Sequence, residues 1–332
     1  IDCLAEDESR NLERIIIVAC GTASYAGDVA KYGIEKWSRI PVQVELSHEF
    51  RYRDPIITER TLVVAISQSG ETMDTLMATR FAKEQGAKVL AICNTQGATL
   101  ARESDAVIYT HAGPEVAVAS TKALTAQITA GFLLGLYLAQ VKERTDKKTL
   151  QNLGKELLKM PARVAKVVEA AKLPMSLGQD MANAKSVLFL GRNVGFPVAM
   201  EGALKLKELA YIHAEGFAAG ELKHGPIALI EEGQPVIVIV PSPRDADSLH
   251  PKVISNIQEI RARGAKVIAI AEQGDDQVGQ YAEHVIFVPK AESMFAAILQ
   301  VIPLQYFALA LSTAKGLDVD QPRNLAKSVT VE

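Results

Sequence analysis

Short apolar runs and longer amphipathic runs alternate along the chain. The segments Arg14–Ala19, Thr61–Ile66 and Lys88–Cys93 are rich in β-branched and other apolar side chains, which is typical of buried parallel strands. Helical patterns at 25–38 and 73–85 follow the first two of these segments. Strands that alternate with helices predict an α/β fold, with a doubly wound, mostly parallel sheet flanked by helices.

The rest of the first half carries weaker signals. Pro41–Leu46 and Asp105–Tyr109 are expected to be short strands, and Ser47–Pro55 a polar connection. Ser120 is placed to cap a long helix that ends near Val141. The apolar part of that helix is shorter than the roughly 20 residues that a membrane span needs. We therefore interpret it as a buried helix.

The second half of the chain restarts the pattern as an internal repeat. Residues 86–92 (GAKVLAI) match residues 264–270 (GAKVIAI) at all but one position, 178 residues later. At the same offset Asp105–Tyr109 aligns with Glu283–Phe287. The economical explanation is two tandem copies of one α/β domain.

The boundaries of the two domains follow from the segment between the copies. A charged, helical stretch at 142–180 separates them, and Pro174 is expected to interrupt it. We place the first domain at 1–150 and the second at 151–315. Residues 316–332 remain as a C-terminal segment.

Composition narrows the class of protein. Hydrophobic residues make up 48% of the 332 and charged residues 23%, as in soluble globular proteins. The net charge of −3 and the lack of a dense Lys/Arg block argue against nucleic-acid binding. Cys3, Cys20 and Cys93 show no C-x-x-C spacing and the six histidines no H-x-x-x-H pair, so no disulfide framework, metal or cofactor is expected. Without a signal peptide or membrane span, we expect a cytoplasmic protein.

The loop Ser67–Thr72 (SQSGET) stands between a predicted strand and a predicted helix. The first turn of a helix has N–H groups without intrahelical partners, and its dipole favours an anion. The hydroxyls of Ser67, Ser69 and Thr72 can add donors, and Gly70 lets the backbone approach a ligand. No lysine follows as in a nucleotide P-loop, so the chemistry suits a small phosphate monoester such as a sugar phosphate. The alternative is an ordinary Ser/Thr helix cap.

A second group of polar residues lies in the second copy. Glu201, Lys205 and Glu208 are spaced to share one face of a helix. The alternative is an exposed stripe of salt bridges. A glycine-punctuated loop with His213 and His224 follows, and it favours a site. A carboxylate can move a proton between adjacent sugar carbons, and a histidine can open a sugar ring, although either histidine alone is more often structural.

The segment Asp318–Glu332 (DVDQPRNLAKSVTVE) is unusually polar and contains Pro322, Arg323 and Lys327. One interpretation is a frayed terminus. The other is a strap that brings Lys327 into a site, where its amine can condense with a substrate carbonyl.

Taken together, these segments resemble the isomerase portion of glutamine–fructose-6-phosphate aminotransferase, also called glucosamine-6-phosphate synthase. That family is built from two sugar-isomerase (SIS) domains, in agreement with the repeat. The matching stretches are ACGT (19–22), SQSGET (67–72), VAST (118–121), EGALKLKE (201–208), ELKHGP (221–226) and DQPRNLAKSVTVE (320–332).

The resemblance implies a set of binding residues for fructose 6-phosphate, glucose 6-phosphate or glucosamine 6-phosphate. The phosphate would be bound by Ser67, Gln68, Ser69 and Thr72. The sugar would be held by Thr22, Val118, Ala119, Ser120 and Ala326.

The resemblance also implies catalytic roles. Glu208 would be the base that moves a proton between C1 and C2, and Lys205 would assist at the developing oxygen anion. His224 would open the ring, reaching the site from the neighbouring subunit of a homodimer. Lys327 would form an imine with the C2 carbonyl. The reaction would aminate C2 and isomerise the ketose to an aldose, giving glucosamine 6-phosphate.

Two departures from the family pattern stand out. Relatives often carry serine where this chain has Ala23, with Ser24 one position on, so one sugar hydroxyl is expected to lose a partner. The family's N-terminal glutaminase domain is absent, since Cys3 in IDCLAED does not resemble its start; the chain begins at Ile1, which allows a preceding domain to be missing. We expect this chain alone to isomerise its substrates but not to hydrolyse glutamine.

Two alternatives remain. Another double-SIS enzyme, a fructosamine-phosphate deglycase or a sugar-phosphate isomerase, fits the fold, but the ending DQPRNLAKSVTVE argues against it. A sugar-phosphate-sensing regulator usually joins one SIS domain to a helix-turn-helix module. Here there are two copies and no basic DNA-reading segment, and such a role would leave Glu208, Lys205 and Lys327 unused.

Overall fold

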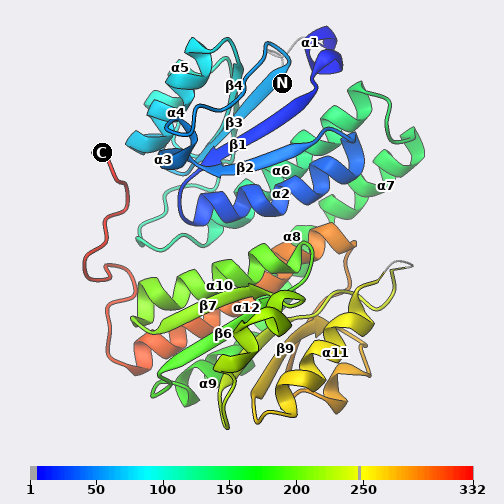
Figure 1. Cartoon of the computed structure of the whole chain (residues 1–332), viewed down its shortest axis with the longest axis vertical. Coiled ribbons are helices and arrows are strands. Elements are labelled where there is room, and N and C mark those ends of the chain that lie inside the picture. The colour runs from blue at the N-terminus through cyan, green and yellow to red at the C-terminus, as the bar shows by residue number, and fades with distance from the viewer. Residues whose placement is uncertain (1–5, 246–247, 332) are drawn as a thin grey trace. The chain divides into compact units, whose positions relative to one another are not determined.

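A computed structural model describes residues 6–245 and 248–331. The chain divides into two compact units (Figure 1). Unit 1 comprises the chain up to Asn152 together with the segment from Ala326 onward, and unit 2 comprises Leu153–Leu325. Each unit contains a five-stranded sheet in which every recorded strand pair is parallel.

The sheet of unit 1 has the order β2-β1-β3-β4-β5. Its strands are β1 (Arg14–Ala19), β2 (Val42–Leu46), β3 (Thr61–Ser67), β4 (Lys88–Cys93) and β5 (Ala106–Tyr109). Successive side chains of β1 enter different cores: Ile15 and Ile17 pack into one cluster, Ile16 and Val18 into another. A strand buried on both faces has no polar positions, which is why β1 reads as a continuous apolar run.

Helices cover both faces of this sheet. They are α1 (Glu6–Asn11), α2 (Thr22–Ser38), α3 (Ser47–Phe50), α4 (Met73–Glu84), α5 (Thr99–Glu103) and α6 (Lys122–Val141). α2 and α6 pack closely, with Gly131 against Ala30 and the rings of Trp37 and Phe132 5.5 Å apart. Phe50 and Leu76 anchor α3 and α4 in the core of the opposite face.

The sheet of unit 2 has the order β10-β9-β8-β6-β7. Its strands are β6 (Ser186–Gly191), β7 (His213–Ala218), β8 (Pro235–Ile239), β9 (Lys266–Glu272) and β10 (His284–Val288). Read from β7, this order repeats that of unit 1 strand for strand. The prediction of two copies of one parallel α/β domain is therefore confirmed.

The two faces of the second sheet are covered by different helices. They include α10 (Gly195–Ala210), α11 (His250–Arg261) and α12 (Ser293–Ala314). Three further helices precede α10 in the chain: α7 (Lys147–Leu158), α8 (Met160–Glu169) and α9 (Lys172–Asp180). Phe189 of β6 faces α10 and α12, where it lies against Gly202 beside Leu304. Its neighbours Leu188 and Leu190 face the core that α11 completes.

Four expectations about local structure were wrong. Ser120 does not cap α6, because Thr121 directly precedes the helix. Pro174 does not interrupt a helix but lies in the first turn of α9, where its missing N–H has no partner to lose. The polar connection after β2 begins with the short helix α3, whose Ser47 and Phe50 are buried. His213 is the first residue of strand β7 rather than part of a loop.

By length and composition, α6 and α12 are apolar enough to cross a membrane. Their most apolar windows are 61% and 78% buried inside the protein, as expected of core helices. The expectation that the first of these is a buried helix is confirmed.

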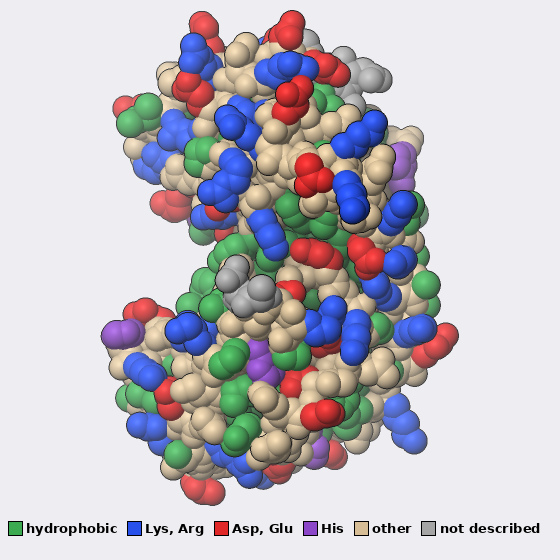
Figure 2. Space-filling view, turned by 90° about the vertical axis from the view of Figure 1, so that its right-hand side faces the viewer, with side chains coloured by type: hydrophobic (Ala, Val, Ile, Leu, Met, Phe, Trp, Pro, Cys, Tyr) green, Lys and Arg blue, Asp and Glu red, His purple; other side chains and the backbone are tan. Residues whose placement is uncertain are grey.

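Figure 2 shows basic and acidic side chains interspersed over the visible face of each unit, with apolar side chains between them.

Candidate active site

The SQSGET loop follows the carboxyl end of β3 and leads into α4. Its hydroxyls bond to the loop itself: the Gly70 N–H donates to Ser67 Oγ at 2.9 Å, and the Glu71 N–H donates to Ser69 Oγ at 3.2 Å. Thr72 stands at the N-cap of α4 but makes no side-chain capping bond. The simple cap interpretation therefore does not account for these residues, because their hydroxyls shape a loop.

Gly70 has a packing role that the sequence did not indicate. Its φ is +70°, in the left-handed region, and a Cβ there would lie 2.6 Å from Ala98 Cβ and 2.7 Å from Cys93 Sγ. The glycine is required because the loop packs closely against Ala98 and Cys93 of the same unit. This contact gives a structural reason for the glycine, and its expected closeness to a ligand stays a prediction.

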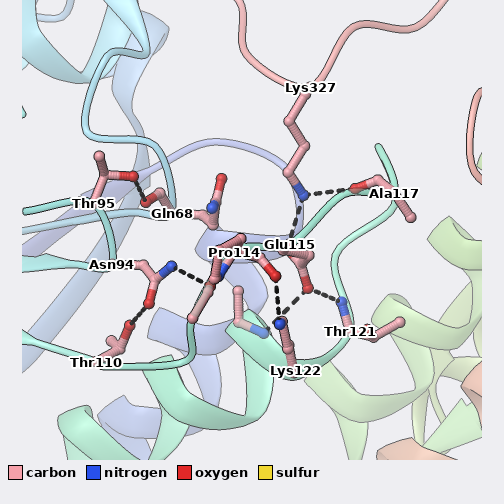
Figure 3. Close-up of polar contacts among 12 residues, drawn as sticks. Gln68, Asn94, Thr95, Thr110, Pro114, Glu115, Ala117, Thr121, Lys122 and Lys327 are labelled. Carbon is pink, nitrogen blue, oxygen red and sulfur yellow. Dashed lines mark hydrogen bonds and ion pairs between the residues drawn. The ribbon is translucent and has the colours of Figure 1, made fainter.

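The end of the chain lies along this loop. Ser328 Oγ is 3.0 Å from Ser69 Oγ, and the Met73 N–H donates to the Val329 carbonyl at 3.0 Å. One of the free N–H groups at the start of α4 is therefore occupied by the chain itself. The Gln68 backbone is also held in place, because its carbonyl accepts hydrogen bonds from the N–H and the hydroxyl of Thr95 (Figure 3).

Thr22 begins α2, directly after the carboxyl end of β1. Carboxyl ends of parallel strands share one edge of a sheet, so Thr22 lies at the same edge as the SQSGET loop. Ser24 is buried and donates to the Gly21 carbonyl at 2.6 Å, whereas Ala23 packs against the core. Ser24 is thus committed to the backbone and does not stand in for a serine at position 23.

The loop after β5 reaches the same edge and carries Glu115. The Glu115 carboxylate accepts hydrogen bonds from the Thr121 N–H at 2.8 Å and the Ala123 N–H at 3.3 Å, where α6 begins. Its other oxygen is 2.8 Å from Lys327 Nζ, which also donates to the Ala117 carbonyl at 2.7 Å (Figure 3). Lys327 is therefore docked on this loop, and the frayed-terminus interpretation does not describe it.

The surroundings of Glu115 favour the charged form of its carboxyl group. Its side chain is only 4% exposed, and burial alone would raise the pKa of the carboxyl. The hydrogen bonds from Lys327, Thr121 and Ala123 outweigh burial and hold the pKa below its ordinary value. Sequence reasoning missed Glu115, because a single acidic residue in a loop gives no signal.

Three of the predicted sugar-binding residues, Val118 to Ser120, lie in the loop between Glu115 and Thr121. Ala119 is buried, and Val118 and Ser120 are half-buried. The buried Ser120 Oγ has no hydrogen-bond partner among the described residues, so its hydroxyl can pair with a group outside the chain. Ala326, next to Lys327 in the chain, is exposed.

In unit 2, Glu201, Lys205 and Glu208 share one face of α10, as predicted. Glu201 and Lys205 are each 1% exposed, so the alternative of an exposed stripe is wrong. Lys205 Nζ is 3.3 Å from Glu201 Oε1 and also pairs with Glu208 Oε2. The Glu208 side chain is 22% exposed, which makes it the member of this triad with access to a substrate.

Burial alone would lower the pKa of the Lys205 ammonium. The attraction of Glu201 and Glu208 outweighs burial and raises the pKa above its ordinary value. The cation is thus held between two carboxylates, one buried and one accessible. Such an arrangement fixes the position of the Glu208 carboxylate.

Glu208 also lines a cavity of about 420 Å³ in unit 2, together with Leu204, Lys207, Tyr211, Arg323, Asn324 and Leu325. Tyr211 anchors the first part of the C-terminal segment: its hydroxyl accepts the Arg323 N–H at 2.7 Å, and the guanidinium carbon lies 4.2 Å from the ring centroid. This contact joins residues 112 apart in sequence, and no sequence pattern indicated it.

His224 is not brought near Glu208 within unit 2. It ends the turn Glu221–His224, whose Leu222 is fully buried in the core on the α11 side of the sheet. Glu208 lies on α10, on the opposite side. His224 itself is exposed, and His213 is an exposed residue that pairs with Glu215 at 3.0 Å.

The predicted residues therefore fall into separate groups, one in each unit. Unit 1 gathers the SQSGET loop, Thr22, Val118–Ser120 and Lys327 at the carboxyl edge of its sheet. Unit 2 gathers Lys205 and Glu208 with the start of the C-terminal segment. Within residues 6–245 and 248–331, no cluster of three or more His, Cys, Asp or Glu residues suits a metal ion.

A family model described as SIS domain matches the chain twice, at residues 10–136 and 180–315. The chain belongs to the SIS-domain family. The two matches contain the two sheets, so each repeat of this chain is one SIS domain.

Relatives narrow the resemblance further. Over its whole length the chain is 66% identical to glutamine–fructose-6-phosphate aminotransferase (isomerizing) from Corynebacterium glutamicum and 65% identical to the protein of that name from Corynebacterium efficiens. The C-terminal domain of glucosamine-fructose-6-phosphate aminotransferase from Francisella tularensis has a similar structure, with a TM-score of 0.90 and 38% identity, covering 96% of this chain and 89% of that domain.

This SIS chain covers 54% of each of the two Corynebacterium relatives, or about half their length. The solved structure that it resembles is likewise described as a C-terminal domain. The resemblance inferred from the motifs is thereby confirmed.

Proposed function

We propose that this chain is the sugar-phosphate isomerase part of a glutamine–fructose-6-phosphate aminotransferase. Its substrate is fructose 6-phosphate, and its products are glucose 6-phosphate and, when ammonia is supplied, glucosamine 6-phosphate. The observation that carries the proposal is the buried triad on α10, in which Lys205 holds an accessible Glu208 carboxylate in place.

In this proposal the substrate phosphate binds at the SQSGET loop of the first SIS domain. Ser67, Ser69, Thr72 and the Gln68 amide supply the donors, assisted by the helix dipole of α4. The sugar lies against Thr22, Val118–Ser120 and Ala326. The unpartnered Ser120 hydroxyl supports this placement, because a sugar hydroxyl can satisfy it.

Glu208 acts as the general base. Its carboxylate takes a proton from C1 of the open-chain ketose and returns it to C2, which converts ketose to aldose through an enediol. Lys205 keeps that carboxylate oriented, and its ammonium supplies a positive charge close to an oxygen anion that develops beside Glu208. Lys327 forms an imine with the C2 carbonyl during amination.

His224 opens the sugar ring from a neighbouring subunit of a homodimer. The position of this histidine supports the assignment, because it is exposed and on the side of the second sheet away from Glu208. The remainder of the relatives' length supplies ammonia from glutamine, so we expect this chain by itself to show no glutamine hydrolysis. We also propose that it works in the cytoplasm.

The test is to incubate the chain with fructose 6-phosphate, with and without ammonium, and to identify the products. Glucose 6-phosphate without ammonium supports the isomerase assignment. Glu208→Gln should then reduce its formation by on the order of a hundredfold or more while fructose 6-phosphate still binds. Binding without any product would contradict the proposal and favour the sensor alternative.

A further inference from the structure

Glu115 joins three parts of unit 1 through one carboxylate. One oxygen accepts the backbone N–H groups of Thr121 and Ala123, and the other meets Lys327 Nζ at 2.8 Å. Its side chain is 4% exposed, so these contacts are protected from water. A buried carboxylate with all of its partners supplied by the chain is a fixed structural reference point.

The backbone between Glu115 and Thr121 is the predicted sugar-binding loop. The carboxylate closes this loop by bonding across it, and Lys122 Nζ also donates to the Pro114 carbonyl behind it (Figure 3). Lys327 enters from the C-terminal segment and bonds to the Ala117 carbonyl within the same loop. The amine is therefore held directly beside the residues that are expected to contact the sugar.

We propose that Glu115 is the positioning residue for Lys327: it holds the amine over the sugar loop and balances its positive charge during imine formation. This inference rests on the proposed function, because it assumes that Lys327 meets the C2 carbonyl of the substrate. No other acidic side chain among the described residues makes an ion pair with Lys327.

In the covalent step, the Lys327 nitrogen carries a positive charge both in the starting ammonium and in the protonated imine that forms. The nitrogen–C2 bond forms, the C2–oxygen bond breaks, and the carbonyl oxygen leaves as water with two of the three ammonium hydrogens. The third hydrogen remains on a protonated imine. Because attack requires a neutral amine, one proton leaves transiently, and the Glu115 carboxylate is within hydrogen-bonding distance to receive and return it. The same carboxylate then faces the protonated imine.

Trapping of the imine measures this role directly. Borohydride delivers hydride to C2 of the imine and leaves Lys327 bonded to the sugar phosphate, which mass spectrometry of the Lys327 peptide detects. In Glu115→Gln the amide oxygen still accepts from Thr121 and Ala123, but the charge facing Lys327 is lost. We expect the trapping rate at saturating fructose 6-phosphate to fall about tenfold to a hundredfold. The half-saturating concentration should stay the same.

Asp105→Asn is the matched control. Asp105 also accepts a backbone N–H, that of Val89 at 2.8 Å, and pairs with a lysine, Lys83, at 3.1 Å, but makes no contact with Lys327. It should trap like the unaltered chain. A merely structural role for Glu115 would instead weaken substrate binding and lower the unfolding temperature without changing the saturating rate.

The outcomes separate the inference from the proposed function. Lys327→Ala is the negative control and must give no adduct at this position. If the unaltered chain also gives no adduct at Lys327, the assigned role of Lys327 is wrong, and the inference about Glu115 is wrong with it. If the unaltered chain is trapped and Glu115→Gln is trapped at the same saturating rate, only the role of Glu115 is overturned. A selective loss of saturating rate supports both.

Discussion

Glu208 and His224 lie on opposite sides of one parallel sheet. Glu208 belongs to α10, which packs on the side that Phe189 faces, and His224 follows Leu222, which is buried on the side that Leu190 faces. A side chain does not reach through a sheet whose strands are about 4.8 Å apart and fully bonded. We therefore predict that, if both residues serve one reaction, they come from different subunits.

This relationship predicts complementation between inactive variants. Glu208→Gln and His224→Ala should each be nearly inactive alone. Mixed under conditions that exchange subunits, they should recover up to about a quarter of the original activity, because half of the dimers are mixed and each has one intact site. Activity is measured as glucose 6-phosphate formed from fructose 6-phosphate.

The control mixture is Glu208→Gln with Lys205→Ala, since both changes lie on the same helix and no dimer of these chains contains an intact triad. That mixture should stay inactive. If the Glu208→Gln and His224→Ala mixture also stays inactive although mixed dimers form, His224 does not act across subunits.

A second prediction concerns the buried triad. Lys205→Met should destabilise the protein by about 3–5 kcal/mol, because it removes the ammonium that balances the charge of the buried Glu201 carboxylate. Adding Glu201→Gln to the same chain should restore part of the loss, since the uncompensated charge is then removed. Urea unfolding of the two variants beside the unaltered chain measures both effects. Equal midpoints for all three chains would mean that the ion pair carries no net stability.

A third prediction is an acid dependence at Glu115. The pKa of this carboxyl is lowered in the folded protein, so its contribution to stability is fully present above its ordinary pKa of 4.5 and is lost as the pH falls through the lowered value. The difference in unfolding free energy between the unaltered chain and Glu115→Gln should therefore be constant near neutral pH and shrink in acid. A difference that persists unchanged in acid would show that the charge contributes nothing.

Much of the fold was predictable from local pattern. Arg14–Ala19 is apolar at nearly every position because both faces of the strand are buried, and the second copy repeats that signal 172 residues later, at Ser186–Gly191. The periodicity of Glu201, Lys205 and Glu208 gave their common face. It did not reveal that Glu201 and Lys205 are buried, because the same spacing of charged residues occurs on exposed helices and on buried ones.

Contacts between distant parts of the chain were beyond sequence reasoning. Lys327 was singled out, but its partner Glu115 lies 212 residues earlier in a loop without periodicity. Tyr211 and Arg323 are likewise joined only by the fold. The packing of Gly70 was also not predicted, since glycine patterns do not distinguish room for a ligand from a close approach of the protein's own atoms.

That distinction leads to a fourth prediction, which compares Gly70→Ala with Gly86→Ala. Both glycines have positive φ, +70° and +87°, so alanine strains the backbone at either site. At Gly70 the added methyl also collides with Ala98 and Cys93, whereas nothing lies within 4 Å of a Cβ at Gly86.

Gly86→Ala should therefore cost about 1 kcal/mol of stability and leave the affinity for the substrate phosphate intact. Gly70→Ala should cost more, and because the SQSGET loop must shift to accommodate the methyl, it should also weaken the binding of fructose 6-phosphate measured by calorimetry. Equal losses of stability with unchanged binding in both variants would mean that the loop yields without moving its hydroxyls, and that its packing does not set the geometry of the phosphate site.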